Sequence, residues 1–337
     1  MNLKRIGLDT SKAVFTVHGV GQDERTALRC SLKRAAVEEF FAKLPPTVVA
    51  LEACGGSHHW GRRLTALGHE VRLIPPQYVK PFVKRGKNDR NDAAAISEAA
   101  GRPEMTVVAV KSAERQAGAM ILSVHELLVG QRTQLVNAIR GQAAEFGVIA
   151  AKGISKIEGL LEKIASDAAM PQAARDMLAL LGARVSELDT QIKQVELQMK
   201  QQHQASPVSR MLDEVPGVGP IIALNCALTV DASQFKSGRH FAAWLGLTPK
   251  ERSTAGRQRL GGISKEGNER LRHLLVSGAM AVIKYARPGS KTASAWLLKL
   301  LERKPRKLAA VALANKTARI VWAMMSSGEA YRRQPAG

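Results

Sequence analysis

The sequence predicts an α/β domain at the N-terminus, followed by a helical segment with a coiled-coil pattern and by a mainly α-helical C-terminal domain. Three observations predict this order. Short runs with the two-residue period of strands alternate with helical runs up to about residue 110. Long stretches of helical spacing then continue to about residue 205, and a glycine-rich hairpin between two apolar runs follows them. We therefore expect domains over residues 1–110, 111–205 and 206–337.

The first domain is predicted to contain both strands and helices. Residues 5–20 alternate apolar with polar or small side chains around a plausible turn at residues 9–12, which predicts a β-hairpin. Residues 32–44 have helical spacing and stop at two prolines, and residues 48–51 predict a short buried strand. A helix, a strand and a second helix are expected to complete the domain, over residues 60–67, 71–74 and 92–100.

No strand is predicted beyond Lys111, and two long helices are expected instead. Residues 113–144 form the first. The second carries the alternating steps of four and three that are typical of a coiled-coil seam, at Leu181, Val185, Leu188, Ile192, Val195 and Met199. The seam indicates either a helical hairpin within one chain or the pairing of two subunits, and the sequence leaves both open.

The charge of the chain indicates the kind of partner. The 337 residues include 50 Lys and Arg against 29 Asp and Glu, a formal net charge of +21, and such a positive field suits a polyanion such as nucleic acid. The longest apolar runs, such as residues 221–228, are far shorter than the roughly 20 residues that a spanning helix needs. The start of the chain lacks the pattern of a signal peptide, and its three cysteines have no metal-ligand spacing. We expect a protein of the cytoplasm without a membrane partner.

Four carboxylates of the first domain stand at positions where they could meet. Asp9 and Glu52 come at the ends of two predicted strands, and Asp89 and Asp92 come at the start of a helix, three residues apart. Clustered carboxylates repel one another unless a cation lies between them, and hard oxygen ligands select Mg²⁺ or Mn²⁺. Two such ions can hold the attacking and leaving oxygens of phosphoryl transfer. The alternatives are structural: Asp89 as a helix N-cap and Glu52 as a solvated strand end.

Two further features indicate nucleic-acid binding. Basic residues that would draw phosphates surround the last two carboxylates, at Lys84, Arg85, Lys87 and Arg90. Residues 215–220 join two apolar runs in a glycine-rich turn typical of a helix-hairpin-helix, in which Gly217 and Gly219 let the backbone approach a phosphate. The turn is equally compatible with an ordinary tight connection.

A long basic loop follows in residues 248–268. Ser253 and Thr254 lie there among cationic side chains that could hold a phosphate and stabilise an alkoxide. These cations are Arg252, Arg257, Arg259 and Lys265. A nucleophilic serine is one interpretation, although hydroxyl groups in loops usually have no chemical role.

Seven segments together resemble a known family along nearly the whole chain. They are residues 6–12 (IGLDTSK), 51–55 (LEACG), 87–93 (KNDRNDA), 215–219 (VPGVG), 243–249 (AWLGLTP), 252–256 (RSTAG) and 259–265 (RLGGISK). In this order they are similar to the DEDD-type transposases of insertion-sequence family 110, closest to its subgroup 1111. The usual Ser-Thr-Gly-Gly or Ser-Ser-Gly-Gly of the family is Ser-Thr-Ala-Gly here.

The resemblance implies a fold, a site and partners. The fold is a RuvC-like RNase H domain whose acidic residues fall on Asp9, Glu52, Asp89 and Asp92 and bind Mg²⁺. The C-terminal transposase domain carries the proposed covalent nucleophile, which falls on Ser253, with Thr254 as the neighbouring candidate. The family is guided by a noncoding bridge RNA that pairs with target and donor DNA.

We therefore expect a transposase, a site-specific recombinase of double-stranded element ends and target DNA. The acidic cluster and Ser253 would form one composite site in a homo-oligomer, a dimer or tetramer, located at the nucleoid. The alternatives are a metal-dependent junction nuclease that uses the carboxylates alone, and a non-enzymatic nucleic-acid-binding protein.

Overall fold

The computed structural model describes residues 3–84, 86, 88–254, 256–290 and 294–332. Arg85 and Lys87, two of the predicted phosphate-binding residues, lie outside the described residues. The chain divides into two compact units, residues 1–116 and residues 117–337. The predicted boundary at residue 205 therefore lies inside the second unit.

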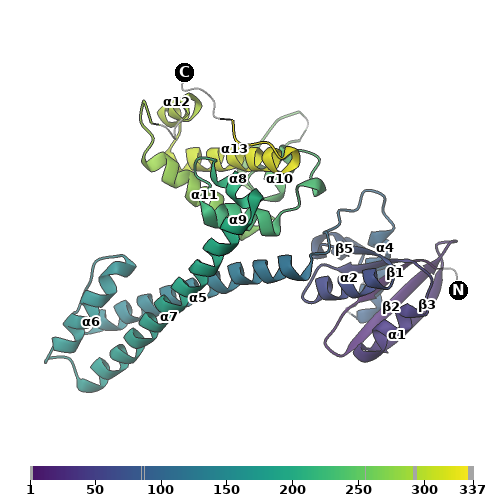
Figure 1. The fold of residues 1–337 in the computed structure, drawn as a ribbon, viewed down its shortest axis with the longest axis horizontal. Coiled ribbons are helices and arrows are strands. Elements are labelled where there is room, and N and C mark those ends of the chain that lie inside the picture. Colours follow the sequence, from purple (N-terminus) through teal and green to yellow (C-terminus); the bar gives the residue numbers. More distant parts are fainter. Residues whose placement is uncertain (1–2, 85, 87, 255, 291–293, 333–337) are drawn as a thin grey trace. The chain divides into compact units, whose positions relative to one another are not determined.

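The first unit is built on a mixed sheet of five strands (Figure 1). The strands are β1 (Leu3–Asp9), β2 (Val14–Gly21), β3 (Thr26–Lys33), β4 (Val48–Glu52) and β5 (Glu70–Ile74), and their order across the sheet is β3-β2-β1-β4-β5. β1, β2 and β3 are antiparallel, whereas β4 is parallel to β1 and to β5. The mixed α/β nature of the domain and its opening hairpin are confirmed.

The third strand, β3, corrects the sequence-based prediction. We expected a helix from residue 32, but the chain remains extended to Lys33 and enters helix α1 (Val37–Ala42) only after a 3₁₀ turn, η1 (Arg34–Ala36). β3 lies at the edge of the sheet, and every second side chain is half-buried from Leu28 onwards. This alternation of Leu28, Cys30 and Leu32 with polar residues is a strand period, which the adjoining helical run obscured.

Helices cover the two faces of the sheet. Side chains of β4 alternate between two separate cores, because Val49 and Leu51 pack with α1 and with α2 (Ser57–Ala66), whereas Ala50 packs with α4 (Asp89–Ala100). The short helices α3 (Pro76–Val79) and η2 (Lys80–Phe82) precede α4. On β1, Gly7 faces α4, and Asp9 comes two residues later on the same face. On β4, Glu52 comes two residues after Ala50, so it also lies on the face that α4 covers.

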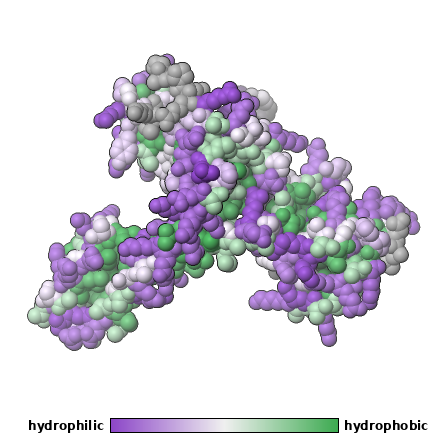
Figure 2. Space-filling view, viewed as in Figure 1, coloured by the Kyte–Doolittle hydropathy of each residue, from purple (hydrophilic) through white to green (hydrophobic). Residues whose placement is uncertain are grey.

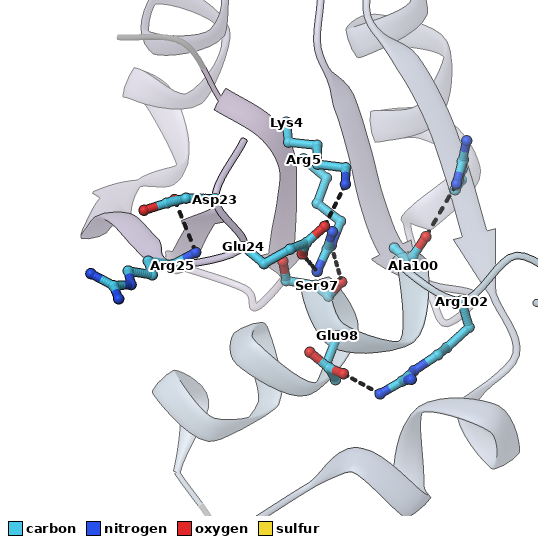
Figure 3. Close-up of polar contacts among 10 residues, drawn as sticks. Lys4, Arg5, Asp23, Glu24, Arg25, Ser97, Glu98, Ala100 and Arg102 are labelled. Carbon is cyan, nitrogen blue, oxygen red and sulfur yellow. Dashed lines mark hydrogen bonds and ion pairs between the residues drawn. The ribbon is translucent and has the colours of Figure 1, made fainter. Parts of the chain in front are cut away.

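A glycine allows α4 to lie directly on β1. A Cβ atom on Gly7 would stand 2.2 Å from the carbonyl oxygen of Ala93 and 2.5 Å from the nitrogen of Ser97, so no larger residue fits without moving the helix. Arg5, two residues earlier on β1, donates from Nε to the Ser97 carbonyl at 2.7 Å and pairs with Glu24 at 2.6 Å (Figure 3). The helix is therefore fixed at one height along β1.

The second unit begins with long helices. They are α5 (Ala113–Glu145, with residues from 117 in this unit), α6 (Ile157–Ser166, after η3, Ile154–Lys156) and α7 (Gln172–Ala205). α5 and α7 run antiparallel, since Arg132 pairs with Asp189 at 2.5 Å and His125 contacts Glu196 at 3.3 Å. In the predicted seam, Val185, Leu188, Ile192 and Met199 are buried within the single chain. This corresponds to the helical-hairpin alternative.

Apolar side chains also remain exposed on these helices. Leu127 of α5 is 59% exposed and Leu180 of α7 is 63% exposed. Figure 2 shows apolar residues interspersed with hydrophilic ones on the surface of the long helices α5, α6 and α7. Any contact of α5 and α7 with another molecule would involve these faces and not the buried seam.

The remaining helices pack around one core, beside which the chain forms a short pair of strands. These elements are α8 (Pro207–Asp213), α9 (Pro220–Thr229), η4 (Ala232–Gln234), α10 (Gly238–Trp244), β6 (Pro249–Glu251), β7 (Leu260–Ile263), α11 (Glu269–Lys284), α12 (Ala295–Arg303) and α13 (Arg306–Ser327). β6 and β7 form an antiparallel hairpin where we predicted a loop without strands. The strands are short and exposed, so burial imposed no strand period on their sequence.

One described helix, α13, is long and apolar enough to cross a bilayer by length and composition alone. With 22 residues, α13 is longer than the apolar run at residues 221–228 that the sequence analysis considered. Ala310, Ala314 and Val321 of this helix are fully buried in the core of the second unit, and Lys316 and Arg319 interrupt its apolar surface. These buried side chains pack in the same core as those of α9, α10 and α11.

We predict that Gly7→Ala lowers the free energy of unfolding by about 1–3 kcal/mol, because the added methyl group forces α4 away from β1. Thermal unfolding followed by circular dichroism measures the change. Gly130→Ala is the matched control, since Gly130 lies within α5 with open space around it and should gain about 0.5–1 kcal/mol from helix propensity. Equal stability of the Gly7→Ala variant would contradict close packing at this point.

Candidate active site

Asp9 and Glu52 lie at the carboxyl ends of neighbouring parallel strands. In the parallel pairing of β1 with β4, Leu8 lies opposite Leu51. The residues that follow them, Asp9 and Glu52, therefore lie beside each other. After Glu52 the chain turns away, as the Cys54 nitrogen donates to the Glu52 carbonyl at 2.8 Å. The crevice at this edge of the sheet is where ligands bind in open α/β folds.

Asp89 and Asp92 occupy the first turn of α4. The helix is capped by Asn88, whose side-chain oxygen accepts from the Asn91 nitrogen at 2.8 Å. The N-cap alternative for Asp89 is therefore wrong, because Asn88 fills that position and Asp89 is the first helical residue. Acidic residues in a first turn are favoured by the helix dipole, which partly offsets their mutual repulsion.

The close approach of α4 to β1 brings the carboxylates together. Asp9, Asp89 and Asp92 each offer a carboxylate oxygen within 4.8 Å of the other two. Glu52 is not part of this close group, but its negative charge raises the pKa of Asp9 and the charge of Asp92 raises the pKa of Glu52. The structure therefore brings three of the four predicted acids into one cluster, with the fourth electrostatically coupled to it.

The carboxylates of this cluster repel one another. Partial burial, followed by the charges of Asp92, Asp89 and Glu52, raises the pKa of Asp9 from 3.8 to about 6. Burial is also the main cause of the raised pKa of Glu52. In the part of the chain that the structure describes, no ion pair involves any of the four carboxylates.

These residues fit a divalent cation. Several carboxylate oxygens converge and are hard ligands, and burial followed by the neighbouring carboxylate charges raises the pKa of Asp9. Lys84 and Arg90, predicted from the sequence to attract phosphates, are both exposed, and Arg90 directly follows Asp89 in the chain. Of the predicted basic group near the cluster, these are the two that the structure describes.

Ser253 lies at the loop end of the β6–β7 hairpin, just after β6. The Ser253 hydroxyl donates to Oε1 of Glu251 at 2.7 Å and accepts from the Arg259 backbone nitrogen at 3.1 Å. Antiparallel contacts continue on both sides of the serine, because the Arg252 nitrogen donates to the Arg259 carbonyl at 2.9 Å and Thr254 forms an isolated bridge with Arg257. The hydroxyl is thus fixed in direction by groups of its own hairpin.

Sequence reasoning missed Glu251. Residues two apart on an extended strand share a face, so a glutamate two positions before an exposed serine was a readable signal once the strand was known. The predicted cations Arg252, Arg257, Arg259 and Lys265 are all exposed around this hairpin. Lys265 adopts a left-handed backbone conformation, with φ of 59°, next to the close contact of Gly246 with the following turn.

The glycines of the predicted helix-hairpin-helix have different surroundings. Gly217 has φ of 85°, and a Cβ atom on it would stand 3.0 Å from the Gly278 carbonyl oxygen of α11. A Cβ on Gly278 would in turn stand 1.9 Å from the Gly217 carbonyl oxygen. Gly217 is therefore required for packing against α11, while Gly219, with no atom near its missing side chain, is the one with open space for a ligand. A phosphate role for either stays a prediction.

Comparison with known proteins agrees with these features. Residues 6–146, which span all four carboxylates, match the transposase family designated DEDD_Tnp_IS110, and residues 209–294, which span the serine hairpin, match the family described as "Transposase IS116/IS110/IS902 family". The chain belongs to the IS110 family of transposases. The predicted family, and with it the prediction of an enzyme that cleaves and recombines DNA, is confirmed.

Relatives match this transposase along almost its full length. It is 55% identical over 98% of the chain, and 86% of the relative, to "Putative transposase y4pF/y4sB" of Sinorhizobium fredii. It is 48% identical to "Probable family 20 transposase" of Pseudomonas aeruginosa, covering 98% and 99% of the two chains. It is 38% identical to "Transposase for insertion sequence element IS1111A" of Coxiella burnetii, covering 98% and 92%. The DEDD type of the family implies a divalent metal ion.

The raised pKa of Asp9 predicts how the metal-free stability of the transposase depends on pH. An acid with a raised pKa binds its proton more tightly in the folded state, so its ionisation penalty is absent below pH 3.8, grows as the pH rises, and is complete above about pH 6. With chelator present at pH 7.5, Asp9→Asn should therefore raise the free energy of unfolding by roughly 1 kcal/mol, a value reduced for solvent screening of a half-exposed group.

Thermal unfolding of wild type and variant at pH 7.5 and pH 4 measures this difference, which should shrink at the lower pH. Glu104→Gln, an exposed carboxylate outside the cluster, is the control. Added Mg²⁺ should raise the melting temperature of the wild type more than that of Asp9→Asn, by mass action on the folded state. A variant less stable than the wild type at pH 7.5 would contradict an uncompensated cluster.

Proposed function

We propose that this transposase is the recombinase of an insertion sequence and that it cuts and exchanges DNA strands with a metal-binding DEDD site and a serine nucleophile. The observation that carries the proposal is the convergence of Asp9, Asp89 and Asp92 in a cluster that forms no ion pair with any residue that the structure describes. A structural role alone does not account for such a cluster, since it costs stability. A phosphate-bound cation is the natural counter-charge.

Asp9, Asp89 and Asp92, with Glu52 beside them, would hold Mg²⁺ or Mn²⁺. When bound, the ion supplies a Lewis acid that stabilises charge on phosphoryl oxygens. The four carboxylates would hold the ion at the carboxyl ends of β1 and β4. The close contact of α4 with Gly7 fixes the position of α4 along β1 and so the position of its two carboxylates. Lys84 and Arg90 would attract the DNA backbone to the same edge.

Ser253 would provide the covalent step. Its Oγ forms a bond to phosphorus, one bridging P–O bond of the DNA strand breaks, and the departing oxygen takes up a proton as a free hydroxyl. Glu251, which accepts the Ser253 hydrogen bond, is placed to receive the serine proton, and the Arg259 N–H can stabilise negative charge on Oγ. Arg252 and Arg257 are available to neutralise the phosphate.

We further propose that the carboxylates and Ser253 act on the same phosphodiester, in a homo-oligomer. The substrates are double-stranded element ends and target DNA at the nucleoid in the cytoplasm. The net charge of +21 supports contact with more than one nucleic acid. The family resemblance supports a bridge RNA as the guide, which is the part of the proposal that depends on no residue identified here.

We predict that Asp9→Asn, Glu52→Gln, Asp89→Asn and Asp92→Asn each abolish strand exchange, by about 100-fold or more, because each removes a ligand charge from the site. Recombination between element-end and target DNA, with Mg²⁺ and copurified RNA, gives the rate. Glu104→Gln should recombine normally. A variant of the four that stays folded and keeps the normal rate would exclude that residue from the site.

Ser253→Ala should bind DNA normally and yield neither recombinant nor a DNA adduct that survives denaturation, a loss of several orders of magnitude. Glu251→Gln should reduce adduct formation by about 100-fold and shift its pH dependence, because an amide cannot accept the proton. Thr254→Ala is the matched control, with a hydroxyl one residue away.

Two results of the adduct assay would change the proposal. An essential Thr254 with a dispensable Ser253 would move the nucleophile by one residue. Cleavage that persists without any adduct when both hydroxyl groups are removed would replace the covalent mechanism with a metal-dependent nuclease.

A further inference from the structure

A groove of about 1090 Å³ lies behind the serine hairpin, within the second unit. Residues of β7, α10, α12 and α13 line it, so it is formed by segments far apart in the sequence. The packing that forms it is tight, because a Cβ on Gly238 at the start of α10 would stand 3.1 Å from the Cα of Arg319 on α13. The proposed function uses none of the side chains that line this groove.

The groove is cationic. Arg239, Lys316 and Arg319 line it, and its lining contains neither aspartate nor glutamate. Within the described ranges of the chain, no carboxylate forms an ion pair with any of the three. Three cations that converge without a counter-charge make the groove complementary to a polyanion.

An aromatic surface lies among these cations. Trp296 of α12 is 39% exposed, and the Nζ atom of Lys316 stands 4.6 Å from the centre of its ring. A second indole, Trp322, is fixed in the lining by a hydrogen bond from Nε1 to the Ala232 carbonyl at 3.1 Å. Sites for single-stranded nucleic acid combine exposed aromatic rings with cations, since bases stack on the rings and phosphates contact the cations.

The groove borders the hairpin that carries the proposed nucleophile. Pro249 of β6 and Gly261 and Gly262 of β7 form one wall, and Gly262 has no atom within 4 Å of its missing side chain. Ser253 lies four residues beyond Pro249 on extended backbone, roughly 13 Å away. A strand that lies against these glycines would therefore run toward the serine hydroxyl.

We propose that this groove binds a short single-stranded segment of nucleic acid, with a base stacked on Trp296 and its phosphates on Lys316, Arg319 and Arg239. The groove holds the strand beside the serine hairpin. The role of the bound strand in cleavage rests on the proposed role of Ser253, whereas the binding of the strand to the groove does not. DNA and RNA share the recognised chemistry, so either could supply the strand.

Fluorescein-labelled oligothymidylate and oligouridylate, titrated with the full-length protein and followed by anisotropy, test the binding. Trp296→Ala should weaken it by about 5- to 100-fold, the loss expected for one stacked base. Lys316→Gln and Arg319→Gln should each lower the affinity and reduce the slope of log K against log salt by about 0.7, one phosphate contact on a single strand. Lys307→Gln, an exposed cation on the same helix but outside the lining, is the matched control.

Unchanged affinity in folded Trp296→Ala and Arg319→Gln variants would overturn the proposal, as would complete competition by a duplex of the same length. Preference for the DNA or the RNA probe assigns the source of the strand and supports the groove in either case. Ser253→Ala should bind both probes like the wild type. A normal adduct yield from Ser253→Ala would refute the proposed nucleophile, whereas the anisotropy result decides the groove independently.

Discussion

The contact of α4 with β1 at Gly7 is the constraint on which the acidic site depends. The helix has no room for a side chain beneath it, so Ala93 and Ser97 lie against the strand and the first turn of α4 is fixed near the end of β1. Arg5 holds the same helix through the Ser97 carbonyl. Because Gly7 and Asp9 share one face of the strand, the glycine and the carboxylate form one arrangement: the first admits the helix, and the second meets the acids that the helix carries.

This arrangement favours function over stability. Three carboxylates with oxygens within 4.8 Å of one another, of which Asp9 and Asp92 are half-buried, repel each other in the absence of a cation. The fold tolerates the repulsion because the sheet and the two cores beside it determine where the chain runs, independently of the charges. Sites that bind ions commonly hold their ligands in advance in this way, so that little reorganisation is needed on binding.

The sequence predicted those parts of the fold and site that have a local signal. Asp9 and Glu52 follow apolar runs that end as strands, so their meeting at one edge could be inferred from the parallel order of the strands. Asp89 was harder to place, because Asn88 and Asp89 are both good N-cap residues and only the structure distinguishes them. Glu251 and the groove had no local signal: the first depended on an unpredicted hairpin, and Arg239, Trp296 and Lys316 meet only through the packing of three helices.

The surroundings of the Ser253 hydroxyl depend on the pairing of β6 with β7. Both partners of the Ser253 hydroxyl belong to it: Glu251 on β6 and the backbone of Arg259 just before β7. A slip of one residue between the strands would turn every side chain to the opposite face and separate the hydroxyl from the Arg259 nitrogen. Since the short strands are exposed and carry glycines at positions 261 and 262, little burial opposes such a slip. The direction of the Ser253 hydroxyl therefore depends on the register of the hairpin.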